Sequence, residues 1–435
     1  MLNLRRRRAV RVASAVLVVV LFLFLGACAK NPVTGEDQLV FMSESRELAL
    51  GNAYYPQVIQ LNWGTPPEDH QLQNYVSDVG WNLADVSHRP NLPWRFTVVN
   101  SSQINAFALP GGKVCITRGL ITKMSSEDEL AGVLGHEIGH VTARHAVSSF
   151  TRRVILAGAL LGLSLALTGT DYGTAALAGA GLTGGLMMLG YSRDQERQAD
   201  ELGYAYMTKA GYNPKAMVKT FELFLSLRNS EPSLIQGWLS THPPPHERIA
   251  AARKRARSSP AGERSIKTEM FQRSLARQKS LARAYVAMDQ GDALAKKRQW
   301  SQVAEQYRKA ISLYPKEGMF YTRLGMAQME QGEEAPALAS AEQGARLSNG
   351  TYYPNLILGI VATANRKYSL AVDAHRKAAE ILPGQVINNF LLAKAHDKIG
   401  PRSSAVLYYR KVVKASPTSD YGKEAAKRLD KLGYR

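Results

Sequence analysis

The sequence predicts an α+β chain that is mainly helical, in which a mixed domain is followed by an all-α repeat solenoid. Its 435 residues are too many for one ordinary core and favour two folded domains. Pro315 and Pro383 lie 68 residues apart and Pro417 follows 34 residues later, a spacing typical of tetratricopeptide repeats. Upstream, the strand-like run 105–117 precedes a run with helical signals that begins at Ser126, so the first domain contains both kinds of element.

The first 27 residues predict an export signal. A basic stretch at 5–11 precedes the uncharged apolar stretch 12–25, which is shorter than the about 20 residues that a membrane span needs. Residues 25–28, Leu-Gly-Ala-Cys, resemble the lipobox of bacterial lipoproteins, in which the cysteine receives a diacylglyceryl group and becomes the mature N-terminus. We therefore expect a lipid at Cys28, with an uncleaved anchor helix as the alternative. By resemblance to lipoprotein sorting in bacteria with two membranes, Ala29 favours the outer membrane over the inner one.

Charge and cysteine content restrict the partners. The formal net charge of +19 favours an anionic partner such as a phospholipid surface. No nucleic-acid-binding motif accompanies this charge, so we expect no nucleic-acid partner. Cys28 and Cys115 are the only cysteines, which excludes a disulfide framework. Cys115 lies in a strand-like run and is expected to be buried.

The strongest signal for chemistry is the run His136-Glu137-Ile138-Gly139-His140. On a helix, His136 and His140 lie on one face, one turn apart, where two imidazoles can bind one Zn²⁺. Glu137 can then act as general base on a zinc-bound water. Downstream, Glu196 and Asp200 share one face of a second predicted helix. Glu196 can complete the zinc site and Asp200 can hydrogen-bond a ligand imidazole; the alternatives are a solvated acidic face, or Glu201 as the third ligand.

Four motifs in this order resemble the gluzincin peptidases related to the CAAX prenyl endopeptidase and to HtpX. They are the HExxH run, the Glu-Xaa-Xaa-Xaa-Asp pattern 56 residues later, and the segments 105–112 and 240–249. The resemblance covers roughly residues 31–255 and implies a zincin-like metalloprotease domain with one Zn²⁺ per chain. It implies that His136, His140 and Glu196 are the ligands and that Asp200 supports one of them.

In the exported, repeat-bearing branch of that family, the resemblance implies that His242 is a switch. It approaches the zinc as a fourth ligand and holds the enzyme latent, or it swings away. His246 offers a second imidazole in the same proline-rich loop, but His242 occupies the motif position. Arg248 is expected to pin this loop through a carboxylate. The other histidines are expected at the surface or in packing, because a continuing helix turns His145 about 140° away from the ligand face.

The strand Asn105-Ala106-Phe107-Ala108 resembles the family's strand beside the active-site cleft. We expect it to bind an extended substrate through main-chain hydrogen bonds. The alternative is an ordinary core hairpin with Gly111 and Gly112 in its turn.

An apolar insert separates the predicted ligands. Between Arg153 and Arg193 the only charged residue is Asp171, and the stretches 154–167 and 174–189 are each short for a membrane span. We expect a helical hairpin that covers the cleft or dips into the membrane, with two transmembrane helices as the alternative.

The predicted domain order is a signal peptide at 1–27, a zinc metalloprotease domain at 28–255 with the insert 154–190, a basic linker at 256–281 and tetratricopeptide repeats at 282–435. Such repeats present a concave surface to a partner. By resemblance, we expect a periplasmic endopeptidase anchored to the outer membrane that degrades misfolded or stalled outer-membrane proteins, with the assembly machinery as partner of the repeats. The alternative is a repeat scaffold or chaperone with minor or latent proteolysis. Glu137 favours the enzyme, because a scaffold needs no base.

Overall fold

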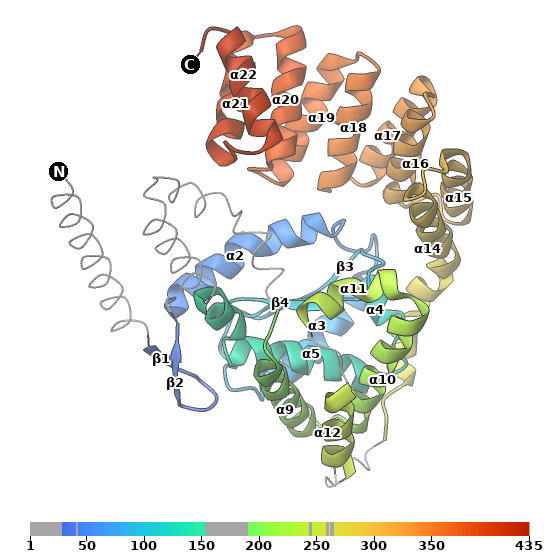
Figure 1. Ribbon diagram of the computed structural model, residues 1–435. Coiled ribbons are helices and arrows are strands. Elements are labelled where there is room, and N and C mark those ends of the chain that lie inside the picture. The colour runs from blue at the N-terminus through green and yellow to red at the C-terminus, as the bar shows by residue number, and fades with distance from the viewer. Residues whose placement is uncertain are drawn as a thin grey trace, which may run out of the picture. The chain divides into compact units, whose positions relative to one another are not determined.

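The computed structural model describes residues 28–40, 42–152, 190–242, 246–257, 261 and 265–434 (Figure 1). The predicted signal peptide and almost all of the predicted insert lie outside these residues. The chain divides into a first unit and a repeat unit. The first unit comprises the chain up to Tyr55, His70–Val98 and Gln103–Ser274, and the repeat unit comprises Pro56–Asp69, Val99–Ser102 and Leu275–Arg435. The predicted domain boundaries at residues 255 and 281 stay a prediction.

The first unit contains a three-stranded sheet with the order β3-β5-β4. Its strands are β3 (Arg95–Val99), β4 (Ala106–Leu109) and β5 (Lys113–Thr117). β4 pairs antiparallel with β5, with Leu109 opposite Lys113. Gly111 and Gly112 form the turn with φ of 75° and 81°, a backbone region that suits glycine. β4 is therefore an edge strand of the three described, and Cys115 on the central strand is buried, as predicted.

Helices cover this sheet and form the rest of the first unit, together with a short hairpin of β1 (Cys28–Lys30) and β2 (Asp37–Leu39). The helices are α2 (Glu44–Leu61), which continues into the repeat unit, α3 (His70–Ala84), α4 (Arg118–Ile121), α5 (Glu127–Thr142), α9 (Arg193–Lys209), α10 (Lys215–Ser230), α11 (Pro232–Thr241), α12 (His246–Arg257) and α13 (Glu269–Ser274). Among the residues described in either unit, no helix has both the length and the apolar character that crossing a bilayer requires.

The repeat unit is a stack of antiparallel helix pairs that follow one another in chain order (Figure 1). Its helices are α14 (Ala276–Ala295), α15 (Trp300–Leu313), α16 (Gly318–Glu330), α17 (Glu334–Leu347), α18 (Tyr352–Ala364), α19 (Tyr368–Ile381), α20 (Val386–Ile399), α21 (Arg402–Ala415) and α22 (Asp420–Lys431). Glycine lets paired helices approach closely: a Cβ on Gly325 would lie 3.0 Å from the Ala337 carbonyl oxygen. The predicted fold class, mainly helical with an all-α repeat region, is confirmed.

Two short segments from within the first 102 residues belong to the repeat unit. The ring of Trp63 stacks on Tyr353 with centroids 4.7 Å apart, and the Arg323 guanidinium lies 4.8 Å from the Trp63 ring centre. The Gln60 side chain donates to the Gly350 carbonyl and accepts from the Tyr352 amide. In the second segment, the Asn100 amide donates to Glu317 at 3.2 Å. These contacts make the two segments part of the repeat core.

Candidate metal centre

The candidate centre depends on a close crossing of helices α5 and α9. Helix α5 begins after Ser126, where the sequence predicted the start of a helix, and the Ser126 side chain caps the helix by accepting the Glu129 amide. Where the helices cross, a Cβ on Gly203 would lie 2.9 Å from the backbone nitrogen of His136, and one on Gly139 would lie 3.0 Å from the Ala199 carbonyl. Glycine therefore lets the two backbones touch and sets the ligand-bearing faces against each other.

This crossing brings four buried side chains together. His136 and His140 come from α5, Glu196 from α9, and His242 from the C-terminal end of α11. Each offers one donor atom, and these atoms all lie within 4.8 Å of one another. All four residues are at most 2% exposed. Such a set of imidazoles and one carboxylate has the chemistry of a metal site.

The spacing of the donor atoms fits a tetrahedral metal ion. Nε2 of His136 lies 3.0 Å from Nε2 of His140 and 3.4 Å from Nδ1 of His242. Oε1 of Glu196 lies 3.4 Å from Nε2 of His140 and 2.8 Å from Nδ1 of His242. Metal–ligand bonds of roughly 2.0–2.1 Å place the ligand atoms of a tetrahedral site about 3.3 Å apart. The residues therefore fit a metal held at the centre of the cluster.

Asp200 and Arg248 surround this cluster. Oδ1 of Asp200 lies 2.9 Å from Nδ1 of His136, and Arg248 donates to both oxygens of Asp200 at 2.7 Å. Nη1 of Arg248 also lies 2.8 Å from Glu196. Burial alone would raise the pKa of Asp200, but Arg248 and His136 outweigh burial and lower it. Asp200 thus stays ionised and fixes the proton of His136 on Nδ1, which leaves Nε2 free for a metal.

Glu137 has the surroundings of a proton acceptor. It is fully buried, and among the described residues neither carboxylate oxygen has a hydrogen-bond partner. Its Oε1 lies 3.8 Å from Nε2 of His242. Burial raises the pKa of Glu137 above its usual value, although His242 and His136 oppose the shift. A carboxylate of raised pKa beside a metal position is suited to take and return a proton.

The other predicted site residues are placed as follows. Asn105 precedes the edge strand β4, which contains Ala106, Phe107 and Ala108. Glu201, the alternative third ligand, lies away from the cluster and pairs with Arg255 at 2.5 Å. The side chains of Cys28 and His246 lie outside the described part of the chain.

The prediction for His145 was wrong. It assumed that α5 continues, but α5 ends at Thr142 and Arg144 adopts a left-handed conformation with φ of 57°. The chain therefore turns back, and His145 lies buried with its Nδ1 2.9 Å from Nδ1 of His140.

Two aromatic residues that sequence reasoning did not single out also flank the cluster. The ring of Tyr191 stacks on His140 with centroids 3.8 Å apart, and the ring of Trp238 stacks on His242 at 4.0 Å. No sequence signal separates these residues from ordinary core aromatics.

Comparison with known proteins finds a family model and curated relatives that match this domain. The model of peptidase family M48 matches residues 70–256. The chain is 35% identical over 225 residues to the beta-barrel assembly-enhancing protease of Escherichia coli O157:H7, covering 49% of this chain and 45% of that protein. It is 29% identical over 255 residues to the mitochondrial metalloendopeptidase OMA1 of Saccharomyces cerevisiae, covering 53% of this chain and 71% of that protein. The chain thus spans about half the length of the beta-barrel assembly-enhancing proteases that it matches.

Among solved structures, the Arabidopsis OM64 TPR domain matches at 18% identity and a TM-score of 0.27, over 28% of this chain and 99% of that chain. Because this similarity is low, the assignment of the repeats depends on the helix pairs described above. The seven polar residues of the candidate centre, from His136 to Arg248, lie within the matched 187-residue stretch 70–256. The chain therefore resembles peptidase family M48 over the stretch that carries the candidate centre.

Proposed function

We propose that this chain is a zinc-dependent endopeptidase of the bacterial cell envelope that hydrolyses misfolded or stalled outer-membrane proteins. The main support is the cluster of His136, His140 and Glu196, whose donor spacing fits a tetrahedral ion. Two imidazoles and one carboxylate are a typical ligand set of catalytic zinc. When bound there, zinc supplies a Lewis acid that polarises the scissile carbonyl and lowers the pKa of a water.

The residues of the chain would divide the remaining work. Glu137 accepts the proton of the attacking water on a carboxylate oxygen and passes it to the leaving nitrogen. Asp200 keeps His136 in the tautomer that leaves Nε2 free. The substrate binds in extended form along the edge strand β4, at residues 105–108, where main-chain hydrogen bonds give affinity with little dependence on sequence.

His242 would hold the enzyme latent. Its ring stacks on Trp238 and its Nδ1 lies within 3.4 Å of donor atoms on both His136 and Glu196, at the fourth corner of the cluster. A zinc with four protein ligands has no position for water, which a catalytic site requires. His242→Ala should therefore raise proteolysis, including self-cleavage, and His246→Ala is the control that should do less. Reduced activity in His242→Ala would instead indicate that His242 stabilises the oxyanion.

The cellular setting is proposed from the relatives and from the sequence. The related bacterial proteases are named for enhancing β-barrel assembly. We propose a lipid anchor at Cys28, attachment to the outer membrane from the periplasm, and binding of the assembly machinery by the repeats. Cys28→Ala should then leave an uncleaved precursor or a mislocalised protein. An unchanged mass and unchanged fractionation would contradict the anchor.

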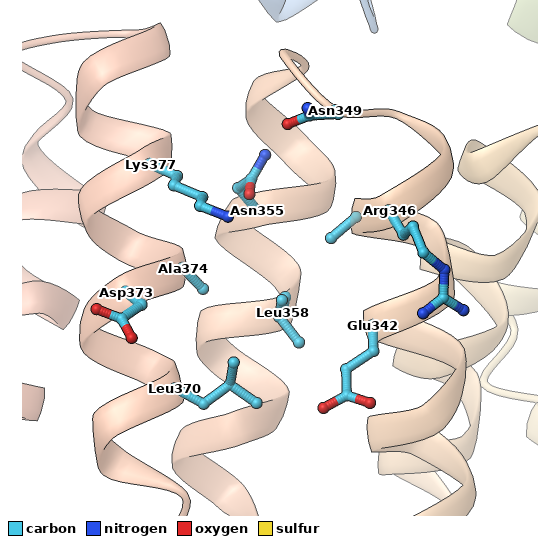
Figure 2. A pocket seen from close by; sticks show the side chains of 10 residues that line it. Glu342, Arg346, Asn349, Asn355, Leu358, Leu370, Asp373, Ala374 and Lys377 are labelled. Carbon is cyan, nitrogen blue, oxygen red and sulfur yellow. The ribbon is translucent and has the colours of Figure 1, made fainter.

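A groove in the repeat unit offers one surface for such a partner. A cavity of about 420 Å³ opens beside helices α17, α18 and α19 (Figure 2). Its apolar lining includes Leu358 and Leu370. Its polar lining carries both signs of charge, with Glu342, Arg346, Asp373 and Lys377. This combination of apolar and charged groups suits a protein segment.

The decisive experiment compares Glu137→Gln with wild type in cells and in vitro. The variant should bind zinc normally and fail to hydrolyse protein, because it keeps the ligands and loses the base. Its substrates should accumulate in the envelope. Retained hydrolysis would refute the proposed mechanism. If the variant supports envelope assembly as well as wild type, while deletion of the repeats does not, the scaffold alternative is correct.

A further inference from the structure

The turn after α5 places a second imidazole behind a proposed metal ligand. His145 is 3% exposed, and its Nδ1 lies 2.9 Å from Nδ1 of His140. Its other ring nitrogen, Nε2, lies 2.8 Å from the side-chain oxygen of Gln198 on helix α9. His145 is therefore held at both ring nitrogens, and one of the two contacts is made to a residue of the cluster.

Hydrogen-bond rules assign the protons along this chain of contacts. Nε2 of His140 faces Glu196 and His136 and must keep its lone pair free to bind a metal. The proton of a neutral His140 is then on Nδ1, which can donate only to an unprotonated Nδ1 of His145. The proton of His145 must accordingly be on Nε2. That is the nitrogen that faces the Gln198 oxygen, which can only accept.

We propose that His145 is a positioning residue, which accepts the Nδ1 proton of His140 and thereby keeps His140 in the tautomer and orientation needed for metal binding. The inference rests on the proposed metal site. It gives the two histidine ligands different supports: His136 donates to the charged Asp200, whereas His140 donates to a neutral imidazole. A neutral acceptor orients the ligand without adding a further negative charge beside Glu196 and Glu137.

The backbone around His145 is fixed by buried contacts, as a positioning role requires. Arg144 donates from Nε to Glu47 at 2.8 Å and from Nη2 to the Met42 carbonyl at 2.7 Å. These bonds hold the left-handed turn that directs His145 back toward His140. On the other side, the Gln195 amide donates to the His145 carbonyl at 3.4 Å. Contacts with α9 and with residues that precede α5 in the chain thus fix the position of the His145 ring.

The test compares two substitutions of the same residue in the full chain. In His145→Asn, the side-chain oxygen stands near the place of Nδ1 and can still accept the proton of His140. In His145→Leu, the side chain has a similar size but no acceptor. Zinc affinity, measured by competition with a chromogenic chelator, should fall about 10- to 100-fold in His145→Leu. His145→Asn should recover most of that loss.

A second readout reports the tautomer directly. In metal-free protein labelled with ¹⁵N-histidine, the ring spectrum should place the His140 proton on Nδ1 in wild type and in His145→Asn. In His145→Leu it should show a mixture of both tautomers. Wild-type zinc affinity together with an unchanged His140 tautomer in His145→Leu would overturn the proposal. Equal losses of affinity in both variants would also overturn it, because they would indicate a packing role.

The reference variant His140→Ala separates this proposal from the metal site on which it rests. It should lose zinc far more completely than either His145 variant. If His140→Ala retains zinc at wild-type affinity, His140 is not a ligand and the proposed metal site itself is refuted.

Discussion

The close crossing of α5 and α9 predicts that a single methyl group at Gly203 weakens metal binding. In Gly203→Ala the added Cβ would lie 2.9 Å from the His136 backbone nitrogen and 3.1 Å from the Gly135 carbonyl carbon. Ordinary contacts begin near 3.4 Å, so α9 must move away from α5 by about half an ångström. The Met217 Cε at 3.0 Å is the end of a flexible side chain and can move aside, but the nearest obstacle, the His136 nitrogen, and the Gly135 carbonyl carbon are backbone atoms and cannot.

The magnitude follows from overpacking. Forcing an extra methyl group into a packed core costs about 1–3 kcal/mol, whereas replacing glycine by alanine inside a helix contributes about 1 kcal/mol in the opposite direction. The metal-free protein should therefore lose at most about 2 kcal/mol of stability. To bind zinc, the variant must bring Glu196 back toward His136 and His140 against this repulsion. The affinity of the variant for zinc should therefore fall by about 1–3 kcal/mol, or about five- to 150-fold.

Gly132→Ala is the matched control because Gly132 is also a helical glycine and lies on α5, the helix that carries His136 and His140. Its Cβ would meet the nearest atom, the Met217 Cα, at 3.6 Å, which is an ordinary contact. This variant should gain up to about 1 kcal/mol of stability and keep its zinc affinity. Both variants are measured by chelator competition and by urea denaturation of the metal-free chain. Unchanged zinc affinity in Gly203→Ala, or an equal loss in Gly132→Ala, would refute the reasoning.

Three further predictions concern stability. Glu47 is 1% exposed and holds Arg89 at 2.9 Å and Arg144 at 2.8 Å. Glu47→Ala leaves the buried Arg144 without its carboxylate partner and Arg89 with only the exposed Glu44 at 3.3 Å, so it should cost about 3–5 kcal/mol in urea denaturation. Burial lowers the pKa of His375 from 6.5 to about 4. Between these pH values the unfolded chain binds a proton at His375 that the folded chain does not, so the full stability is present only above pH 6.5. The free energy of unfolding should therefore fall by about 2 kcal/mol between pH 7 and pH 5. His375→Phe should show a smaller fall in melting temperature over that range, and an identical fall would exclude His375 as the cause. Trp63→Ala removes the stack on Tyr353 and the contact with Arg323, and should lower the unfolding free energy of the repeat unit by about 2 kcal/mol; a first-unit transition that shifts instead would contradict the assignment of this segment.

The sequence alone was sufficient to predict those elements and site residues whose positions depend on local interactions. Ser126 and the acids that follow it define the start of α5, and helical spacing then sets His136 one turn from His140. The same logic places Glu196 and Asp200 on one face of α9. The 34-residue period likewise locates the repeat helices, since each pair repeats the same local pattern.

Sequence reasoning failed where a distant residue decides the local conformation. Arg144 takes its left-handed turn while bound to Glu47, 97 residues earlier, and no pattern around His145 reveals that contact. The same limit applies to Trp63. Its aromatic side chain is compatible with either unit, and only the packed structure places it against Tyr353. Long-range contacts of this kind leave no periodic trace in one sequence.

The path of the chain through its two units has a consequence for proteolytic cleavage and for the transfer of the repeats to another protein. The chain passes from one unit to the other five times, so a single cut in the basic stretch 256–281 does not free the repeats. Residues N-terminal to the cut still supply Trp63, Gln60 and Asn100 to the repeat core. A nicked chain should therefore migrate as one particle until it is denatured. Any transplant of these repeats onto another peptidase must likewise carry the loop with Trp63, because the recipient would otherwise expose the ring of Tyr353 to water.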